Sequence, residues 1–309
     1  MKYFIDTEFL EGTQRESFPI SLVRKNSKPT IDLISIGIVA EDGREYYAIS
    51  KDFNLKEAWD RYDIVPAKIV CNIKQRRGGV RYLAETKKIY WIRDNVLKPI
   101  HYELASKKIS TPSYDVWLEI ITKRENGVYG DRHYKTLKRL INKYGKTNKQ
   151  IADEVKEFCT IGTAMSKLDG TGNFIAFRTK TTKTRDFIED NNCKHIFEAY
   201  PIEFYGYYCD YDWVVFCWLF GRMIDLPKDF PMYCIDLKQE LDRKYPNGKY
   251  KELRPFNKEL DLIAKINPET HWIEEPILMH PNYPKQTNEH SAIHDAKWNK
   301  QLYQFLNNL

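Results

Sequence analysis

The chain has 309 residues, of which 42% are hydrophobic and 14% aromatic, and this composition excludes an intrinsically disordered protein. Its net charge of +6 and its pI of about 8.7 are compatible with a polyanionic partner without establishing one. No apolar run is long enough for a membrane-spanning helix, and acidic residues appear too early for a signal peptide, so no membrane association is expected. The six cysteines include no C-x-x-C pair. This pattern argues against structural zinc and predicts a reducing, cytoplasmic location, with Cys209 and Cys217 as buried free thiols.

An apolar strand predicted near the start of the sequence contains two acidic residues. Residues 3–9 read Tyr-Phe-Ile-Asp-Thr-Glu-Phe, with Asp6 and Glu8 two positions apart. Side chains at positions i and i+2 of a strand point to the same face, so these carboxylates are expected side by side. Two neighbouring acids on a buried strand repel each other and are costly to desolvate unless a cation lies between them. The pattern therefore predicts a divalent-metal site.

Two more predicted strands form an antiparallel meander with the first. Residues 32–39 are almost continuously apolar, residues 45–50 follow, and the Asp42-Gly43 pair between them is a hairpin-turn signal. Residues 11–30 are polar and contain two prolines, so they are predicted to be a loop or insertion.

Three further segments are predicted insertions: residues 54–85, 101–146 and 160–200. The first ends near a basic group that fits either a solvated loop or contacts with phosphates, namely Lys74, Arg76 and Arg77. The third contains a glycine-rich turn signal at 168–174 and a basic run with Arg178 and Lys180. That run fits either a flap near a substrate or a polar surface insertion. Both basic groups are candidate contacts with a nucleic-acid backbone.

Apolar residues at helical spacing predict several amphipathic helices. One is expected over 85–97, where Pro99 would end it. Others are expected over 131–144, 149–159 and 236–244. These helices would cover the sheet that the strands form.

A second acidic position follows a β-rich run at residues 202–209. Asp210 and Asp212 come next, and an apolar helix then ends at Gly221. Acidic side chains are favourable at the N-terminus of a helix. A last helix is predicted over 287–309, with His290 at or just before its start and Asp295 inside it.

Four carboxylates and one imidazole stand out together: Asp6, Glu8, Asp212, Asp295 and His290. Four carboxylates are more than one ion needs and suit two hard ions such as Mg²⁺ or Mn²⁺. Two such ions support in-line attack of water at phosphorus. A histidine can accept the proton of that water near neutral pH. The set is therefore typical of phosphodiester hydrolysis.

On these motifs the sequence resembles the DEDDh superfamily of 3′-5′ exonucleases, the RNase T and oligoribonuclease group with a ribonuclease-H-like fold. The motifs are Phe-Ile-Asp6-Thr-Glu8-Phe, the Tyr211-Asp212 junction and His290-x4-Asp295. Closer similarity is to a small bacterial subfamily of polyadenylate-specific 3′-exoribonucleases. The resemblance covers residues 1–10, 31–53, 88–100, 147–159, 202–228 and 287–307.

The resemblance implies a role for each matched residue. Asp6 would bridge both metals, while Glu8 and Asp295 would complete the nucleophile-side site. Asp212 would hold the leaving-group ion, and His290 would be the general base. The terminal nucleotide would lie beside Phe9 and Leu10, which directly follow Glu8.

Some assignments stay open in the sequence. Asp210 competes with Asp212 as a ligand, and His294 competes with His290; the family spacing favours Asp212 and His290. A catalytically inactive nucleic-acid-binding or partner-binding module on the same fold is an alternative function, although the complete five-residue set argues against it. DNA is an alternative substrate, because discrimination of the sugar depends on contacts with the 2′-hydroxyl.

Taken together, the sequence predicts one α/β exonuclease domain over residues 1–309. It would have a ribonuclease-H-like mixed five-stranded sheet flanked by helices, with the insertions given above. The expected activity is metal-dependent hydrolysis of single-stranded RNA from its 3′ end to nucleoside 5′-monophosphates. Members of this fold often dimerise, so the resemblance also implies a homodimer.

Overall fold

A computed structural model describes residues 1–13, 29–74, 80–106, 131–167, 174–180, 188–190, 193–195, 201–253 and 272–307. The chain divides into two compact units. The first unit comprises residues 1–6, 37–47 and 153–309, and the second comprises residues 7–36 and 48–152.

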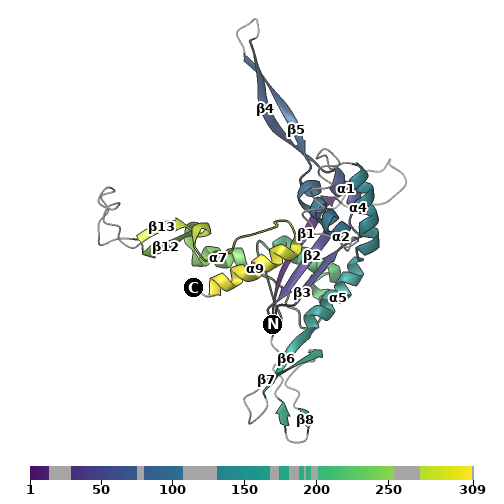
Figure 1. The fold of residues 1–309 in the computed structure, drawn as a ribbon, viewed down its shortest axis with the longest axis vertical. Coiled ribbons are helices and arrows are strands. Elements are labelled where there is room, and N and C mark those ends of the chain that lie inside the picture. The colour runs from purple at the N-terminus through teal and green to yellow at the C-terminus, as the bar shows by residue number, and fades with distance from the viewer. Residues whose placement is uncertain are drawn as a thin grey trace. The chain divides into compact units, whose positions relative to one another are not determined.

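A five-stranded sheet has the order β11-β10-β1-β2-β3. Figure 1 labels β1, β2 and β3 of this sheet. Its strands are β1 (Lys2–Thr13), β2 (Pro29–Ala40), β3 (Glu45–Ile49), β10 (Glu203–Gly206) and β11 (Ile235–Asp236). Strand β10 is parallel to both β1 and β11. A tight turn joins β2 to β3, where the amide of Ala40 donates to the carbonyl of Arg44 at 2.8 Å. The predicted α/β fold with a mixed five-stranded sheet flanked by helices is confirmed.

Strand β1 lies at the centre of this sheet, and its first residues are deeply buried. Tyr3, Phe4 and Ile5 are each no more than 1% exposed. A strand with neighbours on both edges and packed faces requires such a continuous apolar run. The prediction of a buried first strand is therefore confirmed.

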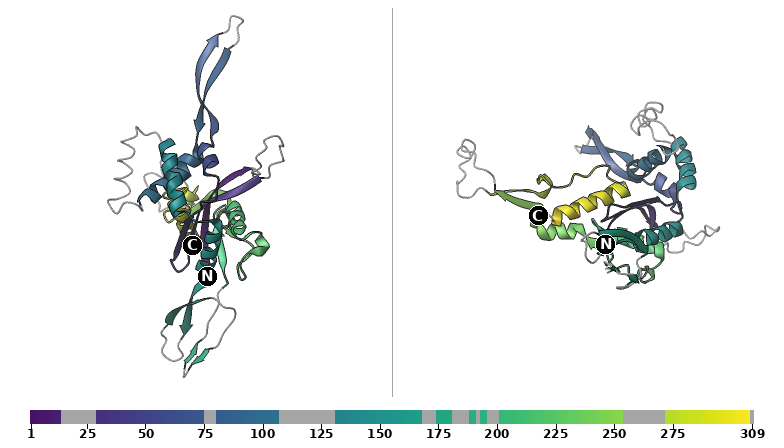
Figure 2. Two further views of the ribbon diagram at one scale, coloured as in Figure 1. Left: turned by 90° about the vertical axis from the view of Figure 1, so that its right-hand side faces the viewer. Right: turned by 60° about the horizontal axis from the view of Figure 1, so that its bottom comes forward.

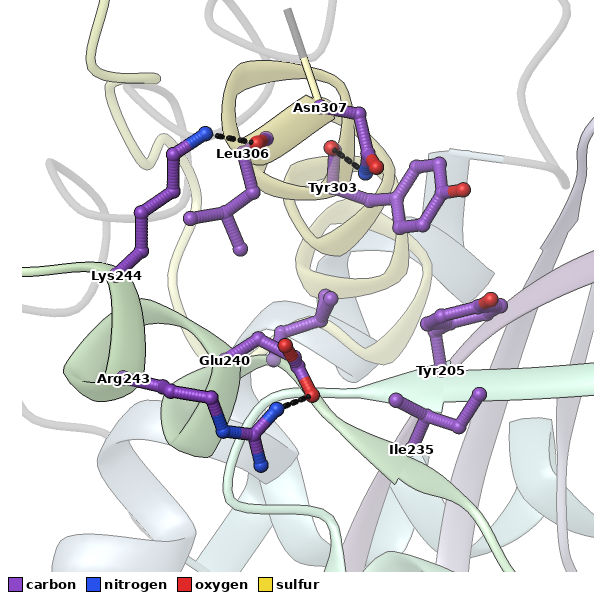
Figure 3. Close-up of a pocket in the computed structure, with 9 residues that line it drawn as sticks. Tyr205, Ile235, Glu240, Arg243, Lys244, Tyr303, Leu306 and Asn307 are labelled. Atoms are coloured by element: carbon purple, nitrogen blue, oxygen red, sulfur yellow. Dashed lines mark hydrogen bonds and ion pairs between the residues drawn. The ribbon is translucent and has the colours of Figure 1, made fainter. Parts of the chain in front are cut away.

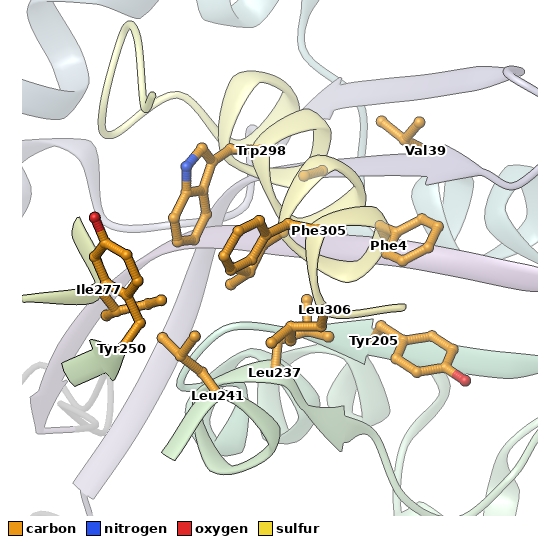
Figure 4. Close-up of a cluster of buried hydrophobic side chains, with 12 residues drawn as sticks. Phe4, Val39, Tyr205, Leu237, Leu241, Tyr250, Ile277, Trp298, Phe305 and Leu306 are labelled. Atoms are coloured by element: carbon orange, nitrogen blue, oxygen red, sulfur yellow. The ribbon is translucent and has the colours of Figure 1, made fainter. Parts of the chain in front are cut away.

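The core of the first unit packs β1 and β10 against two helices, α7 (Leu237–Lys244) and α9 (Ala292–Asn307). These helices are in contact with each other (Figures 1 and 2). Figure 4 shows that the cluster gathers Phe4 from β1, Leu241 from α7 and Phe305 from α9, among other apolar side chains. The helix predicted over 236–244 is confirmed as α7. The side chain of Asp236 caps its N-terminus by accepting a hydrogen bond from the amide of Lys238 at 2.7 Å.

Helix α9 starts close to strand β2. A Cβ atom placed on Gly37 would lie 2.2 Å from the carbonyl oxygen of Ala292 and 2.5 Å from the Cα of Ile293. Only glycine permits this approach of the two backbones. The helix begins at Ala292, five residues later than the predicted start at 287.

The second unit contains a two-stranded antiparallel ribbon formed by β4 (Asp63–Lys74) and β5 (Val80–Ile89). Beside it in the sequence come α1 (Leu55–Asp60), η1 (Arg93–Leu97), α2 (Lys98–Ser106) and α4 (Asp131–Tyr144). The next helix, α5 (Asn148–Thr160), has its N-terminal part in this unit. The helices predicted at 131–144 and 149–159 are confirmed.

The helix predicted over 85–97 is wrong in its first part. Residues 85–89 belong to β5, where Ile89 pairs with Asp63 and Glu85 with Lys68. This long-range pairing overrides the helical spacing of the apolar residues. Pro99 does not end the helix, because η1 and α2 form one continuous helical run over 91–106. A π-helical turn, in which the amide of Lys98 donates to the carbonyl of Arg93, directly precedes the proline.

The other elements of the first unit are short. Strands β6 (Ile161–Lys167) and β7 (Phe174–Lys180) pair antiparallel on either side of the glycine-rich turn signal at 168–174. The predicted hairpin is therefore confirmed, although residues 168–173 lie outside the described part. The rest are α6 (Asp210–Phe220), β8 (Ile188–Asp190), β9 (Cys193–His195), β12 (Lys249–Leu253), β13 (Trp272–Pro276), η2 (Met223–Asp225), η3 (Pro246–Gly248) and η4 (Ile277–Met279).

Two predictions from composition can be compared with the described residues. Cys209 and Cys217 are buried and free, as predicted. No helix in the described ranges is long and apolar enough to cross a bilayer.

Candidate metal centre

The two acids of strand β1 follow directly after its buried apolar residues. Asp6 and Glu8 are partly exposed, while Thr7 between them is 5% exposed. The alternation of a strand therefore gives both carboxylates one face and the threonine the other. Strand geometry explains why this local part of the site was readable from the sequence.

A third carboxylate comes from the first turn of α9. One carboxylate oxygen from each of Asp6, Glu8 and Asp295 lies within 4.8 Å of the other two. Asp295 is 7% exposed. An acid is favoured in the first turn of a helix, where amide hydrogens point toward it. Two neighbouring acids of β1 and one acid about 290 residues later thus form one carboxylate cluster.

Two donors hold the Asp295 carboxylate. The side-chain amide of Gln286 donates to Oδ1 at 2.7 Å, and the backbone amide of His290 donates to Oδ2 at 2.9 Å. Burial nevertheless raises the pKa of Asp295 above the ordinary value of 3.8, and these hydrogen bonds only partly oppose that rise. A nearby cation would favour the ionised form.

Helix α9 is also tied to β1 beside the cluster. The side-chain amide of Asn299, which is 1% exposed, donates to the carbonyl of Ile5 at 2.8 Å. Ile5 precedes Asp6, and Asn299 lies one helical turn after Asp295. This bond therefore links the strand and the helix that together supply all three carboxylates. The sequence analysis did not identify Asn299 or Gln286.

Asp212 lies in the first turn of α6 and is 7% exposed, whereas Asp210 is exposed. The preceding strand β10 is parallel to β1, with Phe4 opposite Tyr205. The two strands therefore run the same way: Asp6 lies within β1, two residues beyond Phe4, the last residue paired with β10, and Asp212 follows the carboxyl end of β10. Asp212 is not in the cluster of Asp6, Glu8 and Asp295, so its role as a ligand stays a prediction.

The turn between β10 and α6 is tight. A Cβ on Gly206 would lie 2.6 Å from the Cβ of Cys209, and Tyr208 adopts a left-handed backbone with φ of 53°. The amide of Tyr208 donates to Oδ1 of Asp236 at 3.1 Å. This turn brings the chain from the sheet into α6 within three residues, and it thereby fixes the position of Asp212 in the first turn of the helix.

His290 is partly buried in the segment just before α9, and its backbone is left-handed with φ of 66°. Its amide bonds to Asp295, so the backbone at His290 is connected to the carboxylate cluster. The competing His294 lies inside α9, with Nδ1 2.9 Å from the hydroxyl of Ser291. The assignment of the general base stays a prediction.

The remaining predicted site residues are not brought into the cluster. Phe9 is partly buried and Leu10 is 1% exposed, so Leu10 is a core residue as well as a predicted neighbour of substrate. Arg76 and Arg77 lie outside the described residues. The strands that contain Lys74, Arg178 and Lys180 are described, but the positions of these side chains are not.

The donor set suits hard divalent cations. The cluster offers only carboxylate oxygens, the ligand type that Mg²⁺ and Mn²⁺ prefer. It contains no imidazole or thiolate, the ligands typical of zinc. The three residues could therefore hold a metal ion of the predicted class.

A separate cavity of about 400 Å³ lies in the first unit between α7, α9 and the sheet (Figure 3). Its cationic groups are already engaged: Arg243 bonds to Glu240, and Nζ of Lys244 donates to the carbonyl of Leu306 at 2.6 Å. Tyr205 and Tyr303 form another part of its lining. None of the predicted site residues lines this cavity.

Comparison with known proteins finds similarity over part of the chain. No family model matches the chain. Part of the chain is homologous to a 3′-5′ exoribonuclease. The identity is 46% over 68 residues with the proteins of that name from Mycobacterium tuberculosis strains H37Rv and CDC 1551. The match covers 21% of this chain and 32% of each relative, so the chain spans about a third of the length of the curated relatives it matches.

The raised pKa of Asp295 gives a pH dependence that can be measured. The folded carboxyl keeps its proton to a higher pH than the unfolded one, so the folded state binds more protons. Its contribution to the free energy of unfolding is full below pH 3.8 and is lost as pH rises through the raised pKa. Urea unfolding with EDTA should show the stability of wild type relative to Asp295→Asn falling over that range.

Saturating Mg²⁺ at neutral pH should reverse that trend, because the ion binds the ionised carboxylate and stabilises the folded state. A difference between wild type and Asp295→Asn that does not change with pH would show that burial does not perturb this carboxyl.

Asn299→Leu should weaken Mn²⁺ binding roughly tenfold or more, because groups outside the ligand set typically contribute 10–100-fold to metal affinity. It should also lower the free energy of unfolding by about 1–3 kcal/mol, the cost of leaving a buried acceptor unpaired. Calorimetric Mn²⁺ titration and urea unfolding measure the two effects. Gln301→Leu, at an exposed position of the same helix, is the matched control. Unchanged Mn²⁺ affinity in Asn299→Leu would limit this bond to a structural role.

Proposed function

We propose that the protein is a metal-dependent 3′-5′ exoribonuclease that shortens single-stranded RNA from its 3′ end. The observation that supports this most directly is the cluster of Asp6, Glu8 and Asp295, formed between the central strand and α9. The partial homology to 3′-5′ exoribonucleases supports the same reaction class.

The proposed site holds two Mg²⁺ or Mn²⁺ ions. Asp6, Glu8 and Asp295 bind them, and Asp212 is the fourth carboxylate. Ions bound there would activate the attacking water and offset the charge that develops on the leaving oxygen. His290 accepts the proton of the water.

In the proposed reaction the water oxygen bonds to the terminal phosphorus, and the bond from that phosphorus to the 3′ oxygen of the penultimate nucleotide breaks. The electron pair stays with this 3′ oxygen, which is protonated to a new 3′-hydroxyl. The terminal nucleotide leaves as a nucleoside 5′-monophosphate. Phe9 and Leu10 are proposed neighbours of that nucleotide, and the basic residues Lys74, Arg76, Arg77, Arg178 and Lys180 are proposed contacts for the backbone.

A paired digestion tests this proposal. Single-stranded RNA and DNA of one sequence, labelled at the 5′ end, are incubated with Mg²⁺ or Mn²⁺, and an EDTA sample serves as control. A metal-dependent ladder that shortens from the 3′ end of RNA is the expected result. The same ladder on DNA alone would change the substrate class. Tight RNA binding without hydrolysis would instead support an inactive binding module.

A further inference from the structure

The base of the β4–β5 ribbon exposes large apolar side chains from both strands and their flanks. Tyr62, Ile64, Ile89 and Trp91 are 42%, 62%, 38% and 42% exposed. In the ribbon (Figure 1) Ile64 pairs directly with Lys88, so these two side chains share one face, whereas Ile89, which pairs with Asp63, points to the other face. We call Tyr62, Ile64, Lys88, Tyr90, Trp91 and Arg93 the ribbon platform. Contiguous exposed apolar surface is a common mark of a binding site.

Cations lie over the aromatic rings of the ribbon platform. Nζ of Lys88 is 4.0 Å from the ring centre of Tyr62, and the guanidinium of Arg93 is 3.6 Å from the ring centre of Tyr90. The two tyrosine rings are themselves 5.7 Å apart. Rings and cations are therefore held together before any ligand binds, which reduces the entropy lost on binding.

The ribbon also concentrates positive charge. Residues 63–89 contain seven basic and two acidic residues, a net charge of +5, while the whole chain has +6. Exposed rings flanking a segment whose sequence is strongly basic match the two requirements of single-stranded nucleic acid, which offers flat bases and a phosphate at every nucleotide. An acidic peptide satisfies the charge but offers no regular series of rings to stack.

We propose that the ribbon platform binds single-stranded RNA through base stacking and phosphate contacts, at nucleotides other than the one being removed. This inference rests on the proposed function and deepens it, because it assigns the substrate as long single strands. A dinucleotide has only one nucleotide besides the one that is removed, so it gains little from a surface that binds the rest of a strand.

Lys88→Glu and the double variant Tyr62→Ala/Trp91→Ala test the platform. Each should weaken binding of a 20-nucleotide single-stranded RNA about tenfold or more, because stacking and charge contacts are both lost. The measurement is fluorescence anisotropy in Ca²⁺ with the Asp6→Asn background, so that no RNA is hydrolysed. Lys88→Glu should also reduce the salt dependence of binding. Lys228→Glu and Tyr233→Ala, which change exposed residues elsewhere, are the matched controls.

Hydrolysis rates separate this inference from the proposed function. In the active background the platform variants should lose kcat/KM on the 20-nucleotide RNA and keep the wild-type value on a dinucleotide. If wild type hydrolyses both RNAs and the variants match it on both, the platform inference is wrong and the exoribonuclease proposal stands. If wild type hydrolyses neither, the proposed function fails, while the anisotropy data still decide whether the platform binds RNA.

The choice of partner is tested in the same system. RNA bound to the platform should be displaced by unlabelled single-stranded RNA and not by anionic phosphatidylserine vesicles at equal phosphate concentration. Displacement by the vesicles, together with loss of vesicle binding in Lys88→Glu, would overturn the RNA assignment in favour of a lipid surface.

Discussion

Asp6→Asn should reduce metal-dependent hydrolysis of RNA by about 10³-fold or more. The carboxylate lies on the central strand within 4.8 Å of the ligand atoms of Glu8 and Asp295. Metal ions provide several kcal/mol of transition-state stabilisation, and each 1.36 kcal/mol corresponds to tenfold in rate. The amide has nearly the shape of the acid but no charge, so it retains the packing of β1 while weakening metal binding.

The measurement combines single-turnover hydrolysis of 5′-labelled RNA with Mn²⁺ titration and urea unfolding. Glu11→Gln is the matched control, because Glu11 is an exposed acid on the same strand. Asp6→Cys adds a positive test: its activity in Mn²⁺ relative to Mg²⁺ should exceed that of wild type, since a thiolate is a poor ligand for the harder ion. Normal hydrolysis by a folded Asp6→Asn protein would remove Asp6 from the metal site.

His290→Gly should lower the rate of hydrolysis roughly 10²–10⁴-fold, the usual contribution of general acid–base catalysis. Glycine suits the left-handed backbone at this position and retains the amide that bonds to Asp295. Any loss of rate in this variant therefore comes from the imidazole and not from backbone strain or from a displaced carboxylate.

Added imidazole should restore part of the rate of His290→Gly, because it can enter the vacated space and accept the proton of the water. His290→Asn, which also tolerates a left-handed backbone, should stay slow with or without imidazole. His294→Ala is the control, because alanine keeps helix α9 intact. A large loss of rate in His294→Ala, with an active His290→Gly, would transfer the general base to His294.

The parts of the fold that depend on local pattern could be predicted from the sequence. The apolar residues of β1, the Asp-Gly turn after β2 and the Gly221 end of α6 each follow from chemistry within a few residues. Gly221 has φ of 115°, and its amide bonds to the carbonyl of Trp218, as expected of a glycine that ends a helix. Asp6 and Glu8 could be paired because a strand has a two-residue period.

The parts that depend on distant partners could not be predicted in this way. The strand at 85–89 forms because it pairs with residues 63–68, and a helical spacing of apolar residues contains no information about that partner. Asn299 is similar, since its partner is a backbone carbonyl 294 residues away. An asparagine inside a helix has no sequence pattern that distinguishes such an anchor from a surface residue.

The bond between Asn299 and Ile5 also bears on when the carboxylate cluster can exist. During synthesis on the ribosome, β1 emerges long before α9, so for most of translation Asp6 and Glu8 lack their third carboxylate. Contacts between residues so distant in the sequence form late in folding, because closing a long loop is entropically costly. With this order of assembly, the proposed exoribonuclease would leave the messenger RNA beside it intact until α9 has folded onto β1.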